Sequence, residues 1–125
     1  MNTLILLILF LHFLGDFVLQ NDWMAQNKSH SMKPLLTHIG IYTATMAAGL
    51  MLYPMMDGYS FGKGGLWAVL YALANGLIHL GVDFVTSRIN SRLWKAGRVH
   101  AFFVSVGFDQ FLHYAALLLT AGILQ

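Results

Sequence analysis

Four long apolar stretches, separated by short polar segments, dominate the pattern of this chain. They cover residues 3–20, 35–53, 65–86 and 105–124. Each is close to the roughly 20 residues that an α-helix needs to cross a lipid bilayer. No β-strand alternation competes with them, and a chain this short would supply few strands for a barrel. The pattern predicts an all-α fold, namely an integral membrane four-helix bundle in a single domain over residues 1–125.

The polar positions inside these stretches follow a repeated spacing. Three stretches contain a histidine and an aspartate four residues apart, and the second has a single histidine near its start. Four residues make about one helical turn, so both members of a pair lie on the same helix face. Ionisable groups at bilayer depth are costly, and they usually face the interior of a bundle. The residues are His12 and Asp16, His38, His79 and Asp83, and Asp109 and His113.

Composition supports a membrane protein and excludes several other classes. Hydrophobic residues make up 58% of the chain and charged residues 10%, against about 25% charged in a typical soluble domain. The mean hydropathy is +0.65. There is no cysteine, which excludes disulfides and thiolate metal sites. The pI of about 9.1 reflects basic residues between the apolar stretches, which favours anionic lipid headgroups over nucleic acid as the partner.

The basic residues also predict the orientation in the membrane. The connections at residues 21–34 and 88–99 hold six of the seven Lys and Arg residues. The positive-inside rule places these connections in the cytoplasm and both termini outside. Residues 1–20 have no basic segment before the apolar run and no small-residue cleavage site after it, so we expect a retained first helix. The prediction is a multi-pass protein of the cell inner membrane.

Depth in the bilayer then brings the polar residues together. At about 1.5 Å of rise per residue, His12 and Asp16, His38, and His79 and Asp83 reach similar depths in the cytoplasmic leaflet. Asp109 and His113 reach them too if residues 100–104 lie along the interface and the helix bends at Gly107. We therefore expect the seven side chains to converge around one centre.

Imidazole and carboxylate groups without thiolates suit divalent Zn, Mn, Fe or Ni. Bundles often build such sites from facing helices. Proton or ion relay and structural hydrogen bonding between helices are the alternatives, and a haem bundle is a third that the carboxylates argue against. An Asp that is not a ligand would act as a general base or would orient an imidazole. The candidate metal ligands are His12, Asp16, His38, His79, Asp83, Asp109 and His113, and the candidate catalytic residues are Asp16, Asp83 and Asp109.

Residues near these pairs are candidates for binding substrate. Gln20 and Asn75 extend the stripes of the first and third stretches, and packing between helices is an equally good explanation for both. Three basic residues just cytoplasmic of the pairs are placed to clamp a phosphate, or alternatively serve only to fix the topology. His30 and His100 look like loop residues. The candidate substrate-binding residues are Gln20, Lys28, Arg88, Arg92 and Gln110.

An ordered set of motifs resembles a known family. The segment from His12 through Gly15-Asp16 and Gln20 to Trp23 and Lys28, then His38, then His79-x-x-x-Asp83, then Asp109-Gln110-x-x-His113 is similar to small bacterial and phage membrane proteins catalogued as domain of unknown function 3307. That family name implies no activity. A looser likeness is to membrane-bound metal-dependent hydrolases of the YdjM type, whose His-Arg pairing is not evident here.

These features together predict a metal-dependent membrane enzyme, a hydrolase of a lipid-linked phosphate or ester at the cytoplasmic leaflet. The alternative is a metal- or proton-binding transport or sensor protein without catalysis. The outer halves of the stretches are nearly all apolar, which favours an enzyme or a sensor over a channel. Membrane lipids and a phosphate-bearing substrate are the expected partners, no nucleic acid is expected, and a homo-oligomer stays open.

Overall fold

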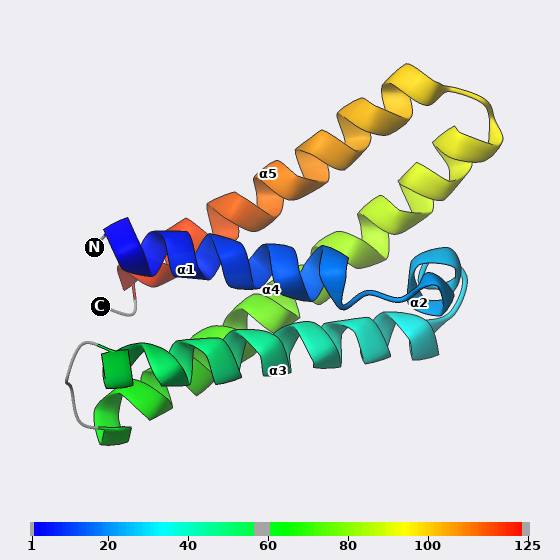
Figure 1. Cartoon of the computed structure of the whole chain (residues 1–125). Coiled ribbons are helices and arrows are strands. Elements are labelled where there is room, and N and C mark those ends of the chain that lie inside the picture. The colour runs from blue at the N-terminus through cyan, green and yellow to red at the C-terminus, as the bar shows by residue number, and fades with distance from the viewer. Residues whose placement is uncertain (1, 57–60, 124–125) are drawn as a thin grey trace.

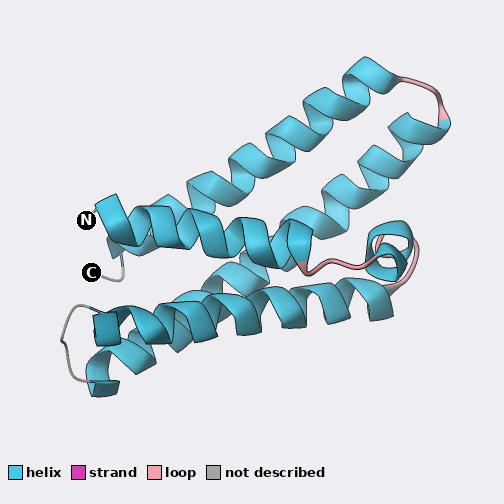
Figure 2. Cartoon of the chain, in the orientation of Figure 1, coloured by secondary structure: helices cyan, strands magenta, loops and turns pink. Residues whose placement is uncertain are grey.

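The computed structural model describes residues 2–56 and 61–123, and these ranges contain helices and no strand (Figures 1 and 2). The all-α prediction is therefore confirmed. Five α-helices and one π-helical segment follow each other within these ranges: α1 (Asn2–Phe13), η1 (Leu14–Val18), α2 (Asp22–Asn27), α3 (Met32–Met56), α4 (Phe61–Lys95) and α5 (Val99–Ile123).

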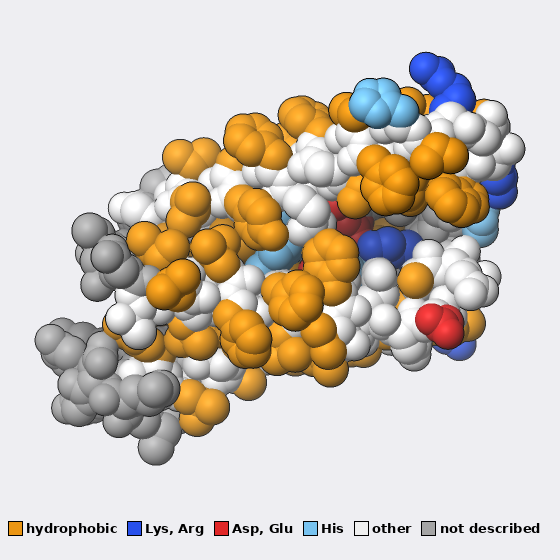
Figure 3. All heavy atoms as spheres, turned by 45° about the horizontal axis from the view of Figure 1, so that its top comes forward, with side chains coloured by type: hydrophobic (Ala, Val, Ile, Leu, Met, Phe, Trp, Pro, Cys, Tyr) orange, Lys and Arg blue, Asp and Glu red, His pale blue; other side chains and the backbone are white. Residues whose placement is uncertain are grey.

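Three helices are long and apolar enough to cross a membrane, over Met32–Tyr53, Gly64–Lys95 and Val99–Gly122. The first apolar helix, Thr3–Val18, is shorter than these and stops before the predicted end at residue 20. Large apolar side chains such as Leu77 and Leu119, 72% and 69% exposed, cover the outside (Figure 3), while four histidines and three aspartates are buried inside. Apolar groups outside and polar groups inside are typical of a membrane protein.

Helices α4 and α5 extend beyond their predicted bounds. The predicted end of the third stretch at residue 86 is wrong as a helix end, because α4 continues to Lys95. The residues after position 86 are more polar, but polar side chains do not by themselves end a helix. Gly97 ends it instead: it has φ +68°, and the amides of Gly97 and Arg98 donate to the carbonyl oxygens of Trp94 and Leu93 in a Schellman motif.

The predicted start of the fourth stretch at residue 105 is also wrong. Helix α5 begins at Val99 and runs unbroken to Ile123, without ending at Gly107. A single glycine without a neighbouring proline lowers helix propensity but does not interrupt the hydrogen-bond ladder. The predicted end at residue 124 lies outside the described residues. Residues 100–104 are therefore the first turns of α5.

The connection predicted at residues 21–34 contains a short helix, α2. Its N-cap is Asn21, whose side chain accepts a hydrogen bond from the amide of Met24 at 2.9 Å. Met24 is buried, and α2 packs against α3. The connection is therefore an ordered element at the end of the molecule that holds both basic connections (Figure 1).

Helices α1, α3, α4 and α5 pack around two layers of interior side chains. The main helix pairs are α3 with α4, α4 with α5, and α1 with α3. Gly49 lets α1 approach α3, since a Cβ there would collide with the Leu11 side chain. The layer toward the termini is the apolar core, which consists of Ile8, Leu11, Tyr42, Met46, Leu50, Ala68, Tyr71, Ala72, Leu117 and Ala121.

Candidate metal centre

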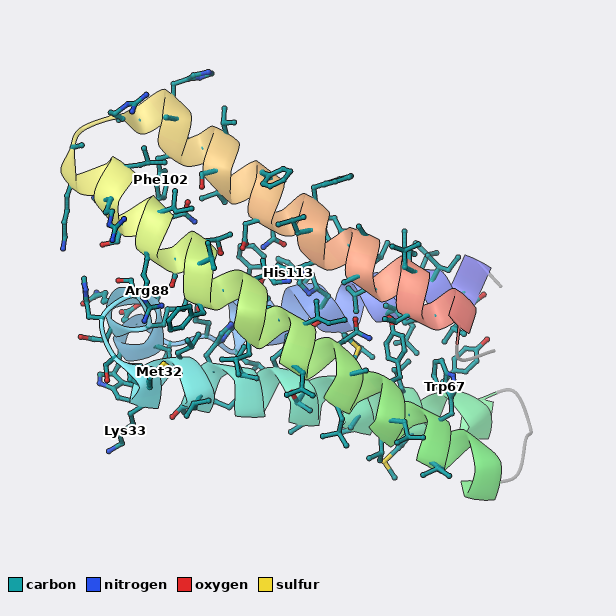
Figure 4. The ribbon with its side chains drawn as sticks, turned by 180° about the vertical axis from the view of Figure 1, so that it is seen from behind. Met32, Lys33, Trp67, Arg88, Phe102 and His113 are labelled. Carbon is teal, nitrogen blue, oxygen red and sulfur yellow. The ribbon has the colours of Figure 1, made fainter. Side chains whose placement is uncertain are left out.

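The second interior layer is made of the seven predicted histidines and aspartates, which we call the His/Asp cluster. All seven residues are buried, and each is 7% exposed or less. They come from all four packed helices, and Figure 4 shows His113 pointing into the bundle from α5. The predicted convergence is thus present in the structure. The members are His12, Asp16, His38, His79, Asp83, Asp109 and His113.

Helix α1 changes to a π-helix where it carries Asp16. The segment Leu14–Val18 is π-helical, a rare form that is frequent at functional sites. A Cβ on Gly15 would lie 3.3 Å from the Cα of Tyr42, so glycine permits the backbone to approach α3 here. This local geometry directs the Asp16 carboxylate toward α3 and α4.

Four side chains converge most closely. His38 Nε2 lies 3.1 Å from Asp16 Oδ1, 3.2 Å from His79 Nε2 and 3.4 Å from Asp83 Oδ2. His79 Nε2 lies 3.2 Å from Asp16 Oδ1 and 3.5 Å from Asp83 Oδ2. These residues form a group whose potential ligand atoms all lie within 4.8 Å of one another, and we call it the four-residue group.

The spacing of these atoms fits the coordination shell of a small divalent cation. With metal–ligand distances of about 2.1 Å, neighbouring ligand atoms lie about 3.4 Å apart in a tetrahedron and about 3.0 Å apart in an octahedron. The observed separations of 3.1 to 3.5 Å match this range. Two imidazole nitrogens that face each other and the same carboxylates are well placed to share a cation.

A second group shares Asp16 and adds Asp109 and His113. His113 Nε2 lies 3.5 Å from Asp109 Oδ1 and 3.3 Å from Asp83 Oδ1. Thr86 donates a hydrogen bond of 2.6 Å to Asp109 Oδ1. The Asp109 carboxylate is thus held by a hydroxyl group as well as by its position in the cluster.

Gln110 bonds to aspartates of both groups and determines which ring nitrogen of His12 donates a hydrogen bond. Its Nε2 donates to Asp16 Oδ2 at 3.0 Å and to Asp109 Oδ2 at 3.1 Å. Its Oε1 therefore faces His12 Nε2 at 3.0 Å, and an amide oxygen only accepts hydrogen bonds. His12 must then donate from Nε2, and its Nδ1 lies 3.2 Å from the Tyr42 hydroxyl.

His12, one of the predicted ligands, lies in neither group of potential ligands. Gln110 and Tyr42 contact its two ring nitrogens. Gln110, predicted to bind substrate, is instead bonded to the cluster. In this structure His12 and Gln110 position the Asp16 carboxylate.

Lys28 also lies closer to the cluster than its sequence position suggested. Its ammonium group forms an ion pair of 2.7 Å with Asp83 Oδ2, and its side chain is only 16% exposed. The prediction placed Lys28 just outside the cluster, at headgroup level. The structure turns it inward because Lys28 lies at the C-cap of α2, which packs against α3.

Aromatic packing fixes the imidazole rings. The ring of His79 lies 4.1 Å from that of Tyr42 and stacks on that of His113 at 4.0 Å, measured between centroids. The Nδ1 atoms of His38 and His79 are buried without a hydrogen-bond partner among the described residues. Ring stacking, rather than a hydrogen bond on the outer nitrogen, therefore sets the orientation of His79.

Sequence reasoning missed two contributors, Tyr42 and Thr86. Tyr42 lies four residues after His38 and Thr86 three residues after Asp83, so both lie on the helix faces that carry the cluster. This spacing was a usable signal. Tyr42 had been overlooked because an aromatic residue in an apolar stretch usually packs in the core.

The remaining candidates lie around the cluster or away from it. Gln20 Oε1 is buried without a partner in the described part of the chain. Asn75 belongs to a separate pair, since its Nδ2 donates to Thr120 Oγ1 at 2.9 Å and to the Tyr71 carbonyl. Arg88 and Arg92 line a basic cleft with His30. His100 is exposed on α5.

The comparisons with known proteins identify the family but not the activity. Residues 4–125 match the family described as "Protein of unknown function (DUF3307)", and the chain belongs to this family. No curated protein and no solved structure matched the chain. The likeness to hydrolases of the YdjM type received no support from these comparisons. Any statement of function must therefore come from the cluster itself.

Proposed function

We propose that this protein is a membrane-embedded, metal-dependent hydrolase of a lipid-linked phosphate or ester reached from the cytoplasmic leaflet. The observation that carries the proposal is the convergence of His38, His79, Asp16 and Asp83 at the spacing of a metal shell. Bound there, a divalent Zn, Mn, Fe or Ni ion would supply Lewis-acid chemistry to a phosphoryl or carbonyl oxygen.

The charge of the cluster supports a divalent cation. Three aspartates are buried in it, and Lys28 is the one Lys or Arg side chain that pairs with them among the described residues. With neutral histidines, two negative charges remain uncompensated. Buried charges without partners are strongly unfavourable, and one divalent cation would balance these two.

Two further side chains have roles that follow from their positions. Asp109 lies outside the four-residue group and is held by Thr86 and Gln110. It is placed to accept a proton from a water molecule that attacks the substrate. Lys28 would pair with an anionic substrate oxygen, because its ammonium group lies between Asp83 and a cavity that opens beyond the cluster.

The membrane arrangement is part of the proposal. Helices α1, α3, α4 and α5 would form the four-helix bundle in the inner membrane, with α2 at the cytoplasmic surface and both termini outside. The support is the apolar length of these helices and the gathering of basic residues at one end (Figure 3).

Single cysteines at two exposed positions, Ala25 and Ala96, test this orientation, because the chain has no cysteine of its own. We expect both to react with a membrane-impermeant maleimide only after the cells are opened. Labelling of either position in intact cells would contradict the orientation.

A transport function is the runner-up, and the interior argues against it. A conduit needs polar groups across the whole membrane. Here the layer beyond the cluster is the apolar core, in which residues such as Met46, Leu50 and Leu117 are at most 1% exposed. The cluster therefore ends as a closed site, which suits an enzyme or a sensor.

Metal binding and hydrolysis in the same preparation test the proposal. Purified protein is stripped with EDTA, reloaded with Zn²⁺ or Mn²⁺, and assayed for phosphate release from dioctanoyl phosphatidic acid and from 4-methylumbelliferyl phosphate. We expect metal-dependent release. The Asp16→Asn variant should lose both metal and activity, whereas Asp109→Asn should keep metal in the four-residue group and lose activity by about 100-fold or more, the usual contribution of a general base.

Either failure is informative. Metal binding with no hydrolysis of either probe would contradict the proposed hydrolase activity and favour a sensor. Failure to bind metal at all would overturn the metal site and leave a proton relay or a structural polar layer.

A further inference from the structure

A cavity of about 480 Å³ lies next to the His/Asp cluster, between α2 and the ends of α4 and α5 that are joined by their loop. Figure 4 shows Phe102 between α4 and α5 at this end of the molecule, with Arg88 beside α2. In Figure 3 basic and acidic atoms are visible in a hollow bordered by hydrophobic side chains. The cavity is lined by polar residues on one part of its wall and by Trp94, Phe102 and Phe103 on another.

The polar part of the wall contains groups that lack partners. Ser87 Oγ and Asn90 Oδ1 are buried and have no hydrogen-bond partner among the described residues. The Ser87 residue is only 9% exposed. A buried polar group without a partner usually costs about 1–3 kcal/mol. Both residues line the cavity, so this part of its wall is polar.

A basic cleft of about 250 Å³ adjoins this cavity. The two share Ser29 and Ser91 as lining residues. The cleft adds three cationic side chains, Arg88, Arg92 and Lys95. Cationic side chains together with hydroxyl groups are typical of a phosphate site.

The aromatic part of the wall suits an acyl chain. The ring centroids of Trp94 and Phe102 lie 5.1 Å apart, and Trp94 and Phe103 are 59% and 62% exposed. These residues are near the end of the molecule where the basic side chains gather. Aromatic side chains at this level of a membrane protein contact the boundary between headgroups and hydrocarbon.

Lys28 links the cavity to the cluster. It lines the cavity and at the same time pairs with Asp83 at 2.7 Å. Asp83 in turn belongs to the four-residue group. A ligand in the cavity would therefore be separated from this group by one ammonium group.

We infer that the cavity and the basic cleft together bind an anionic phosphate-bearing lipid. The phosphate headgroup would lie among Arg88, Arg92 and Lys95, and the acyl chain would follow Trp94, Phe102 and Phe103. This inference deepens the proposed function, on which it rests for the reaction, because it narrows the substrate class to phosphate-bearing lipids and locates their binding site. Binding of the lipid itself requires no metal.

Quenching of Trp94 fluorescence by brominated lipids tests the inference in metal-free protein. The Trp23→Phe and Trp67→Phe substitutions leave Trp94 as the single tryptophan. The protein is reconstituted with EDTA into phosphatidylcholine nanodiscs that contain a small fraction of brominated phosphatidic acid, phosphatidylglycerol or phosphatidylcholine. We expect stronger quenching by the two anionic lipids than by brominated phosphatidylcholine.

Two double variants with the same charge change separate the cleft from the general surface charge. Arg88→Gln with Arg92→Gln should weaken the preference for anionic lipid by about thirtyfold, at about fivefold for each cation near a headgroup. Lys33→Gln with Arg98→Gln removes two cations that line neither the cavity nor the cleft, and it should change the preference by less than about fivefold. Equal loss in both variants would overturn the inference.

Two further comparisons test whether free phosphate is the ligand and whether the charge of the lipid matters for binding. Inorganic phosphate should not relieve the quenching, and relief by it would assign the site to free phosphate instead. Equal quenching by all three lipids would also overturn the inference. Because metal is absent throughout, these results do not depend on the metal site, whose failure would appear only in the metal titration.

Discussion

The same four helices build two interior layers of opposite character. Toward the termini, α1, α3, α4 and α5 supply Ile8, Met46, Ala72 and Leu117 to the apolar core. One to two turns away the same helices supply His12, His38, His79 and His113 to the His/Asp cluster. Helix association is fully achievable with side chains of the first kind, so the second layer is not needed to form a bundle.

The two layers differ in how completely their polar groups are paired. In the apolar core a polar pair such as Asn75 with Thr120 is internally satisfied. In the cluster, three carboxylates lie among four histidines, and one ammonium group pairs with Asp83, so with neutral histidines the layer has a net negative charge. Charge of this kind in a membrane interior is typical of a functional site. Substitutions at four positions and one measurement test this contrast.

The largest expected effect is on metal affinity at His79. His79→Ala removes one nitrogen from the four-residue group and should lower the affinity for Zn²⁺ or Mn²⁺ beyond detection in a titration, since a coordination shell is lost. The exposed His100→Ala is the matched control and should bind as the parent does.

Leu117→Ala is the substitution in the apolar core that corresponds to His79→Ala in the His/Asp cluster. It should lower the thermal stability, since large-to-small core changes cost about 2–5 kcal/mol, while the metal affinity stays within a few fold. Loss of stability in His79→Ala without loss of metal affinity would reverse the roles that we assign to the two layers.

An intermediate effect is expected at Gln110. Gln110→Leu removes the donor to Asp16 and Asp109 and frees His12 Nε2. Groups that orient metal ligands typically contribute about 10- to 100-fold in metal affinity. We therefore expect Gln110→Leu to lower the metal affinity by this factor, measured in a competition titration with a chelating dye. Gln110→Glu should be no better, because a carboxylate cannot donate to a carboxylate. An unchanged affinity in both variants would remove the positioning role.

The smallest effect is expected at the polar pair in the apolar half. Thr120→Val removes the hydroxyl group that Asn75 contacts, and hydrogen bonds between membrane helices contribute about 0.6 kcal/mol on average. A small decrease in thermal stability with unchanged metal binding is the expected result. A change in metal affinity would show that the two layers are coupled.

Residue spacing was sufficient to predict the four apolar helices and the convergence of the cluster. Pairs such as His79 and Asp83 lie on one helix face whatever the tertiary structure, and matched depth then limits where they meet. Spacing does not reveal lateral partners, however. The bonds of Gln110 to Asp16 and His12 join residues more than ninety positions apart, and only the packing of α5 against α1 brings them together.

The helix boundaries were predicted wrongly for a different reason. Polarity changes where a helix leaves the membrane, but the backbone continues until a residue stops it. Helix α4 therefore runs past Arg88 to Lys95, and Gly97 ends it. The inward turn of Lys28 depends on the short helix α2, whose N-cap Asn21 was a readable signal within a segment interpreted as a loop.

Elemental analysis of the purified protein tests the central claim most directly. The protein is isolated in detergent without chelators, and its metal content is measured before and after EDTA treatment and reloading with Zn²⁺ or Mn²⁺. Our account predicts at least one divalent transition-metal ion for each chain, absent from His79→Ala and retained by His100→Ala. Protein that contains no stoichiometric metal and binds none on addition would contradict it.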